Sequence, residues 1–176
     1  MFDTLITSKT RLKLLLKFFL NENNSSYLRN LESEFNESTN AIRLELNRFE
    51  EAGLLKSFEK GNKKMFQADK SHPFFKDIKR LLHKYVGIDS LVESIVKDLG
   101  DLKKVYITGD LSKGRESNII DLIFIGAIDT ESLVKWVSKA EKFMNRKVRY
   151  VIFAEDELND DIKEKLSKGV LIYNRA

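Results

Sequence analysis

Apolar residues recur at helical spacing in three stretches near the start of the chain. Ser8 can cap the first helix, and a polar run ends it. Ser25 or Ser26 can cap a second, short helix, and a third is expected from about Thr39 to Gly53, where glycine suits a helix end. The inward positions of these helices are apolar: Leu12, Leu15, Leu16, Phe19, Tyr27, Leu28, Leu31, Phe35, Ile42, Leu46 and Phe49.

The pattern changes after Gly53. The stretch "LLKSFEKGNKKMFQAD" places apolar residues on both sides of a turn at Gly61 and Asn62, which suits a tight hairpin with positive φ. Three helices followed by a two-stranded hairpin with a basic tip is the element order of a winged helix-turn-helix domain. We therefore expect such a domain over residues 1–72.

The run "STNAIRLELNRFEEAGLLKSFEKGNKKMFQAD" resembles the recognition helix and wing of ArsR- and MarR-type bacterial repressors. The matching helix-exit residues are Leu46, Phe49, Ala52, Gly53 and Leu54. The resemblance implies that the third helix enters the DNA major groove and that the wing tip reaches the backbone or the minor groove.

Helical geometry then selects the residues that would face double-stranded DNA. If the apolar face of the third helix is buried, its first turn and opposite face present Ser38, Thr39, Asn40, Arg43, Asn47 and Arg48. The wing would supply Lys60, Asn62, Lys63 and Lys64 for phosphate contacts. Glu45, Glu50 and Glu51 place negative charge on the same helix. The alternative is that these are ordinary solvent-facing residues.

A helical connector is expected over residues 73–100. Pro73 should lie in the first turn of a helix, and Gly87 should end it. We interpret His83 as a surface residue. A second helix is expected over residues 89–99. The broad apolar stripe of the first helix suits a homodimer contact or burial within one chain: Phe74, Phe75, Ile78, Leu81, Leu82 and Tyr85.

Residues 101–176 alternate between strand and helix patterns and predict a compact α/β domain, so the fold class is a two-domain α+β and α/β arrangement. Trp136 is expected in its core. The expected strands are 102–108, 119–126, 147–153 and 170–173, and the expected helices are 130–145 and 157–166.

The stretch "YITGDLSKGRESNIIDLIFIG" resembles the nucleotide-binding strands of the minimal nucleotidyltransferase fold, which DNA polymerase β-like and aminoglycoside-modifying enzymes share. Gly109 and Asp110 stand where the family has Gly-Ser, and Asp121 stands at its second acid. The first acid position holds Ile119, and the third falls at about Tyr150. The loop between the two strands carries Lys113, Gly114 and Arg115.

Nucleotidyl transfer needs neighbouring carboxylates that hold two Mg²⁺ ions, and one aspartate does not supply them. We therefore expect a catalytically inactive domain without a bound metal or cofactor. Its loop could hold a nucleotide or phosphate-bearing ligand, which would make the domain a sensor, or the domain could be a dimerisation scaffold. The residues in question are Gly109, Asp110, Lys113, Gly114, Arg115 and Asp121.

Charge supports an anionic partner for the first half of the chain. Residues 1–87 carry 16 Lys and Arg against 11 Asp and Glu, whereas the remainder has a net charge of −1. The chain has no cysteine, which excludes disulfides and thiolate metal sites, and no apolar run is long enough for a membrane span. Since its start shows no targeting signal, we expect a cytoplasmic protein without a membrane partner.

The first hypothesis is therefore a DNA-binding transcriptional regulator with a catalytically inactive nucleotidyltransferase-like domain. The second is an active nucleotidyltransferase with an appended winged helix. The third is a module whose winged helix binds protein.

Overall fold

The computed structural model describes residues 2–89, 92 and 99–175. The fold is mixed α/β and contains a three-stranded and a four-stranded sheet. Internal contacts divide the chain into two compact units. Unit 1 comprises residues 1–82 together with Lys113–Arg115, and unit 2 comprises His83–Ser112 and residues 116–176.

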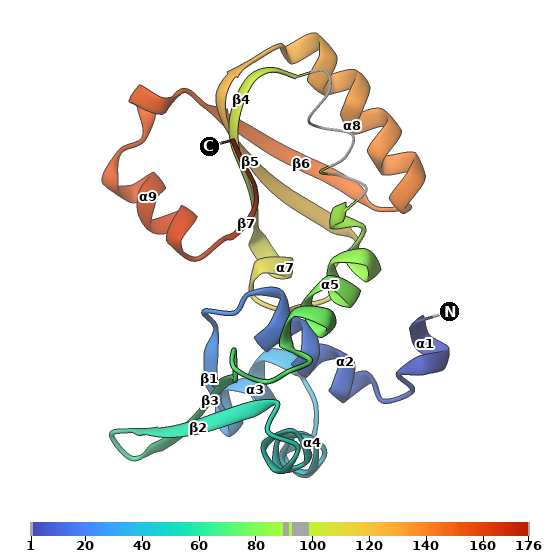
Figure 1. The fold of residues 1–176 in the computed structure, drawn as a ribbon, viewed down its shortest axis with the longest axis vertical. Helices are drawn as coiled ribbons and strands as arrows, with labels where there is room; N and C mark the ends of the chain where they lie inside the picture. The colour runs from blue at the N-terminus through green and yellow to red at the C-terminus, as the bar shows by residue number, and fades with distance from the viewer. Residues whose placement is uncertain (1, 90–91, 93–98, 176) are drawn as a thin grey trace. The chain divides into compact units, whose positions relative to one another are not determined.

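The helices of unit 1 form where the apolar periodicity predicts them (Figure 1). Ser8 caps the second helix by accepting a hydrogen bond from the backbone N–H of Arg11, and Ser38 caps α4 in the same way through Ala41. The core-facing side chains of α4 are buried as expected: Ile42, Leu46 and Phe49. The bounds are α1 (Phe2–Leu5), α2 (Lys9–Leu15), the π-helix η1 (Leu16–Leu20), α3 (Leu28–Phe35) and α4 (Thr39–Glu51).

A strand precedes α3 where a helix cap was expected. Residues Ser25–Tyr27 form β1, which pairs antiparallel with β3 (Lys63–Ala68). The prediction that Ser25 or Ser26 caps the helix is therefore wrong, and Tyr27 takes the capping position without a side-chain hydrogen bond. The backbone of this segment is satisfied by the neighbouring strand, a partner distant in sequence.

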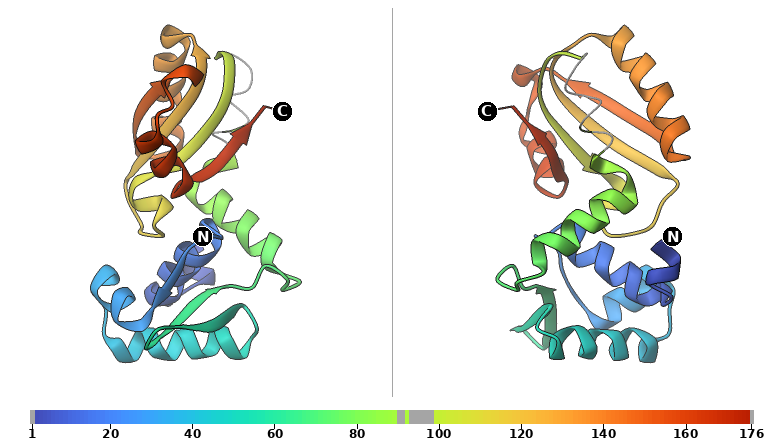
Figure 2. Two further views of the ribbon diagram at one scale, coloured as in Figure 1. Left: turned by 90° about the vertical axis from the view of Figure 1, so that its left-hand side faces the viewer. Right: turned by 45° about the vertical axis from the view of Figure 1, so that its right-hand side comes forward.

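The hairpin follows α4 as predicted. β2 (Leu55–Lys60) pairs with β3 up to Lys60 opposite Lys63, and Gly61 adopts φ 62° at the turn. Gly53 adopts φ 72° after α4, which a residue with a side chain would rarely do. α4 and the hairpin lie next to one another in Figure 2.

The connector helix differs from its expectation in two respects. α5 runs Phe75–Val86, so Pro73 precedes the helix rather than lying in its first turn. The backbone N–H of Phe74 instead donates to Nδ1 of His72. His83 is half-buried, with Nδ1 3.9 Å from the carboxylate of Asp89, and is not a surface residue. The helix expected at 89–99 lies largely outside the described residues.

Unit 2 contains a sheet of order β6-β5-β4-β7. The central pair β4–β5 is antiparallel, β7 joins β4 antiparallel, and β6 joins β5 parallel. The bounds are β4 (Gly100–Thr108), the helical turn α7 (Gly109–Ser112), β5 (Ile119–Ile128), α8 (Thr130–Met144), β6 (Lys147–Phe153), η2 (Glu155–Glu157), α9 (Asp160–Ser167) and β7 (Val170–Asn174).

The two faces of this sheet are covered by different helices. Ile123 and Ile125 pack with Leu166 of α9, and on the other face Phe124 meets Trp136 of α8 edge-on at 6.0 Å. Figure 1 and Figure 2 show α8 and α9 on opposite faces. Trp136 is buried, which confirms its predicted place in the core.

No helix in the described part of the chain combines the length and apolar character that crossing a bilayer requires.

Candidate functional site

The structure leaves the predicted DNA-facing side of α4 open to solvent within unit 1. Arg43 and Asn47 are exposed on the side opposite the buried stripe. Neither makes an ion pair or hydrogen bond through its side chain with any residue among 2–89, 92 and 99–175. The other predicted contacts at this end are exposed or half-buried: Ser38, Thr39, Asn40 and Arg48.

The negative charge of Glu45 does not reach that surface. Its side chain is only 7% exposed and accepts hydrogen bonds from Arg11 (2.9 Å) and Arg48 (3.1 Å). The hydrogen bond to Glu45 raises the pKa of Arg11, against the opposing effect of its burial. Glu45 is thus an interior anion with two cationic partners, and Arg48 is bound to it rather than fully available for DNA.

Glu50 is also paired, and it connects α4 to the hairpin. Lys64 Nζ lies 2.7 Å from its carboxylate, and the hydroxyl of Ser57 donates to it as well. The Lys64 bond, followed by the Ser57 bond, lowers the pKa of Glu50. The pair holds α4 beside the β2–β3 hairpin, and it gives Lys64, a predicted phosphate contact, a carboxylate partner.

The predicted contacts at the tip of the hairpin are exposed: the basic Lys60 and Lys63 and the neutral Asn62. Lys63 Nζ sits 4.4 Å from the ring centroid of Tyr27, a cation–π arrangement that keeps the charge near the surface. Of the basic residues predicted to face DNA, three have no carboxylate partner among the described residues: Arg43, Lys60 and Lys63.

In unit 2, Asp121, which stands at the second acid position of the stretch, forms an ion pair with an arginine. Asp121 lies opposite Arg149 in the parallel β5–β6 pair. Arg149 Nε and Nη2 donate to the two carboxylate oxygens at 2.7 and 3.0 Å. This bidentate bond raises the pKa of Arg149, and the charge of Asp110 acts in the same direction. The residue opposite Asp121 is thus Arg149, and Tyr150, the predicted counterpart of the family's third acid, lies opposite Leu122.

Gly109 allows this close arrangement. Its φ is 67°, and a Cβ added there would lie 2.1 Å from Oδ2 of Asp121. Asp110 and Asp121 come from neighbouring segments, but no group of three or more potential metal ligands occurs among the described residues. The carboxylates of Asp110 and Asp121 thus both act on the guanidinium of Arg149.

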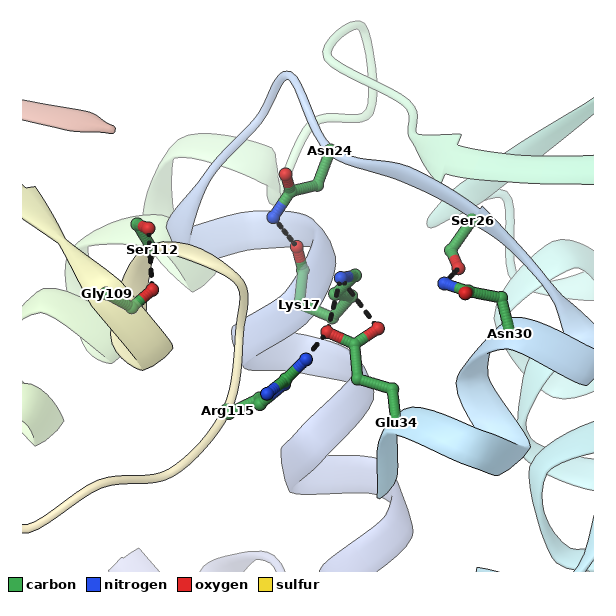
Figure 3. A network of polar contacts seen from close by, with 8 residues as sticks. All are labelled: Lys17, Asn24, Ser26, Asn30, Glu34, Gly109, Ser112 and Arg115. Carbon is green, nitrogen blue, oxygen red and sulfur yellow. Dashed lines mark hydrogen bonds and ion pairs between the residues drawn. The ribbon is translucent and has the colours of Figure 1, made fainter. Parts of the chain in front are cut away.

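The loop residues Lys113, Gly114 and Arg115 belong to unit 1, where Gly114 packs against the backbone of Lys17. A Cβ on Gly114, at φ 78°, would lie 2.0 Å from Cα of Lys17. Arg115 Nε donates to Glu34 Oε1 at 3.3 Å. Figure 3 shows this network, in which Lys17 Nζ also binds both oxygens of Glu34. Arg115 therefore has a carboxylate partner, and only Lys113 of the two loop cations has none among the described residues.

Sequence reasoning missed several of these residues. Arg11, Glu34 and Lys17 lie in predicted helices, and nothing in their local pattern marks them as partners of distant charges. Arg149 could have been found, because its alternation along β6 places it on the same face as Asp121 once the two strands are paired in register.

No protein-family model and no curated protein matches the chain. Several solved structures resemble about half of it. A mutant of the toxin-antitoxin MntA-HpeT matches at 14% identity and TM-score 0.42, over 51% of this chain and 74% of that one. Reduced HlyU from Vibrio cholerae N16961 matches at 19% identity and TM-score 0.39, over 48% and 83%.

A protein described as a possible transcriptional regulator for arsenical resistance matches at 24% identity and TM-score 0.32, over 50% of this chain and 86% of that one. Solved structures similar to half of the chain thus include a toxin-antitoxin protein and a described regulator. Because their TM-scores are below 0.5, these matches support no inference about function.

Proposed function

We propose that the protein is a double-stranded DNA-binding transcriptional regulator whose α4 enters the major groove. The observation that supports this most is the exposed face of α4 with Arg43 and Asn47, next to a hairpin with Lys60 and Lys63 at its tip. Arginine can pair with guanine and asparagine with adenine through two hydrogen bonds each, whereas the lysines would bind phosphates.

The ion pairs of two glutamates on α4 support the same proposal. DNA repels carboxylates, and Glu45 and Glu50 would oppose binding if they were free. Each instead has a basic partner within 3.1 Å. The field over the face of α4 is therefore more positive than the sequence of the helix alone suggests.

The test is a fluorescence anisotropy titration of the whole chain with mixed-sequence duplex DNA at several salt concentrations. We expect Arg43→Ala combined with Lys63→Ala to weaken binding by about ten- to a hundredfold and to reduce the salt slope by about one, the contribution of the phosphate contact of Lys63. A matched control changes the same charge elsewhere: Lys139→Ala combined with Lys142→Ala, two exposed lysines of α8. Equal affinity of both double variants would contradict the proposal.

We further propose that the regulator acts as a homodimer through α5. Phe74 and Leu81 are 64% and 45% exposed on one side of this segment, with Ile78 half-buried between them. Spacing of four and three residues places these side chains on one helical stripe. A second copy of the chain would cover this stripe, and two-fold operators would match such a dimer.

We propose that the nucleotidyltransferase-like unit does not catalyse nucleotidyl transfer. Asp121 is bound by Arg149, and Ile119 stands where a second carboxylate is needed for two Mg²⁺ ions. Incubation with labelled nucleoside triphosphates and Mg²⁺ should give no pyrophosphate release above that of Asp121→Ala. Mg²⁺-dependent release that Asp121→Ala abolishes would favour an active enzyme instead.

A further inference from the structure

Unit 1 contains an open polar pocket of about 340 Å³, lined by Lys17, Asn30, Ser33, Glu34, Lys113 and Arg115. Figure 3 shows Lys17, Asn30, Glu34 and Arg115 in this region. All six lining residues are polar or charged, so the pocket does not suit an apolar ligand.

The charges of the pocket do not cancel. Lys17, Lys113 and Arg115 face one carboxylate, Glu34, which leaves two positive charges. Glu34 is bound by Lys17 at 2.8 and 2.9 Å and by Arg115 at 3.3 Å. The amine of Lys113 is exposed and has no hydrogen-bond or ion-pair partner within residues 2–89, 92 and 99–175. An anion would therefore meet an unused ammonium group at the rim.

The neutral lining residues add donors at fixed positions. Asn30 Nδ2 donates to the buried Ser26 Oγ at 2.9 Å, which orients the amide and leaves its second N–H for another acceptor. Ser33 contributes a hydroxyl without a partner among the described residues. The contact of Gly114 with the Lys17 backbone holds the main chain between Lys113 and Arg115 in place.

We propose that this pocket binds a small phosphate-bearing anion. A phosphomonoester carries about −1.5 to −2 charges at pH 7 and three acceptor oxygens, which match the two excess positive charges and the donors of Lys113, Ser33 and Asn30. The volume lies at the lower end of the ~300–1,000 Å³ typical of ligand pockets, so a small metabolite fits and a DNA duplex does not.

The site is separate from the α4 surface, so it can be tested without DNA. Isothermal titration calorimetry of the full chain, in phosphate-free buffer of low ionic strength, would use inorganic phosphate, AMP and adenosine as probes. We expect heat from phosphate or AMP and none from adenosine, which lacks the phosphoryl group. If AMP binds and inorganic phosphate does not, the ligand is a nucleotide. If AMP and inorganic phosphate both bind, the pocket recognises a phosphoryl group in general.

Four variants test the residues. Lys113→Ala should weaken binding about tenfold or more, the effect of losing one charge-assisted hydrogen bond, whereas Lys113→Arg should stay within about threefold. Ser33→Asp should abolish binding by adding a negative charge to the wall. Lys139→Ala, an exposed lysine outside the pocket, is the matched control and should leave affinity unchanged.

Circular dichroism would confirm that each variant is folded, as expected for exposed positions. The proposal is overturned if neither phosphate probe binds at millimolar concentration, if adenosine binds as tightly as AMP, or if Lys113→Ala and Lys139→Ala bind equally. The DNA affinity of the Arg43→Ala and Lys63→Ala double variant tests the proposed function and does not test the pocket.

Discussion

Four carboxylates that would oppose an anionic ligand are each held by a basic side chain. Arg11 binds Glu45, Lys64 binds Glu50, Lys17 binds Glu34 and Arg149 binds Asp121, all at 2.9 Å or less. The pairs differ in environment, because Lys17 and Glu34 are only 10% and 8% exposed whereas Arg149 is 67% exposed. Only the first kind of pair is expected to matter much for stability.

The buried pair gives a stability prediction. Glu34→Gln keeps the shape of the side chain but leaves the ammonium of Lys17 without its carboxylate. We expect a loss of about 2–3 kcal/mol, somewhat below the ~3–5 kcal/mol of fully buried pairs because this one borders an open pocket. Urea denaturation would measure it, with the exposed Glu51→Gln as the matched control. A loss no larger than that of the control would show that the pair is energetically neutral.

At the scale of the elements, α4 is positioned by interactions at both ends. Ser38 Oγ accepts from the backbone N–H of Ala41 at 3.2 Å at its start, and Glu50 binds Lys64 of β3 near its end. Because the pKa of Glu50 is lowered, this second interaction stabilises the folded state at pH values above the ordinary pKa of a glutamate. It is lost as pH falls through the depressed value.

The cap separates the structural role of Ser38 from its predicted role at DNA. Ser38→Ala removes the cap and should cost about 1 kcal/mol of stability, with little effect on DNA affinity. Ser38→Asp keeps a capping oxygen and should preserve stability, but its charge should weaken DNA binding several-fold. Thermal unfolding and anisotropy titration of both variants would check this. If Ser38→Asp binds DNA as well as the unmodified chain, the start of α4 does not face phosphate.

For the whole molecule, the basic excess lies in residues 1–87, the part of the chain that carries α4 and the hairpin. The proposed homodimer would place two such basic surfaces on one DNA molecule, and two linked sites bind more tightly than one. Dimerisation and DNA affinity should therefore change together.

Leu81→Lys tests this coupling. A charge at this exposed position of the α5 stripe should weaken self-association at least tenfold, because a lysine amine must be desolvated in an apolar interface. Sedimentation equilibrium would measure the dimer dissociation constant. Phe143→Lys, at a 75% exposed apolar position of α8, is the matched control and should leave it unchanged. A monomeric unmodified chain at micromolar concentration would rule out the dimer.

Local patterns predicted most of the elements. Apolar periodicity located α2, α4, α8 and the strands β4 to β6. Gly53 predicted a helix end and Gly61 a turn, since glycine readily adopts the positive φ that both positions have. These features depend on interactions within a few residues, so they can be read from consecutive positions. The β1 strand was missed, since its partner β3 lies about forty positions further along the chain.

The sequence by itself thus determined the order of most of the elements and the exposed face of α4. Only the tertiary structure decided which charges are available. It pairs Glu45 with Arg11, Asp121 with Arg149 and Glu34 with Lys17 and Arg115, and leaves Lys113 at the rim of a pocket. Charge pairing depends on side chains that approach within a few ångströms, and residues distant in sequence are brought together only by the packing of the fold.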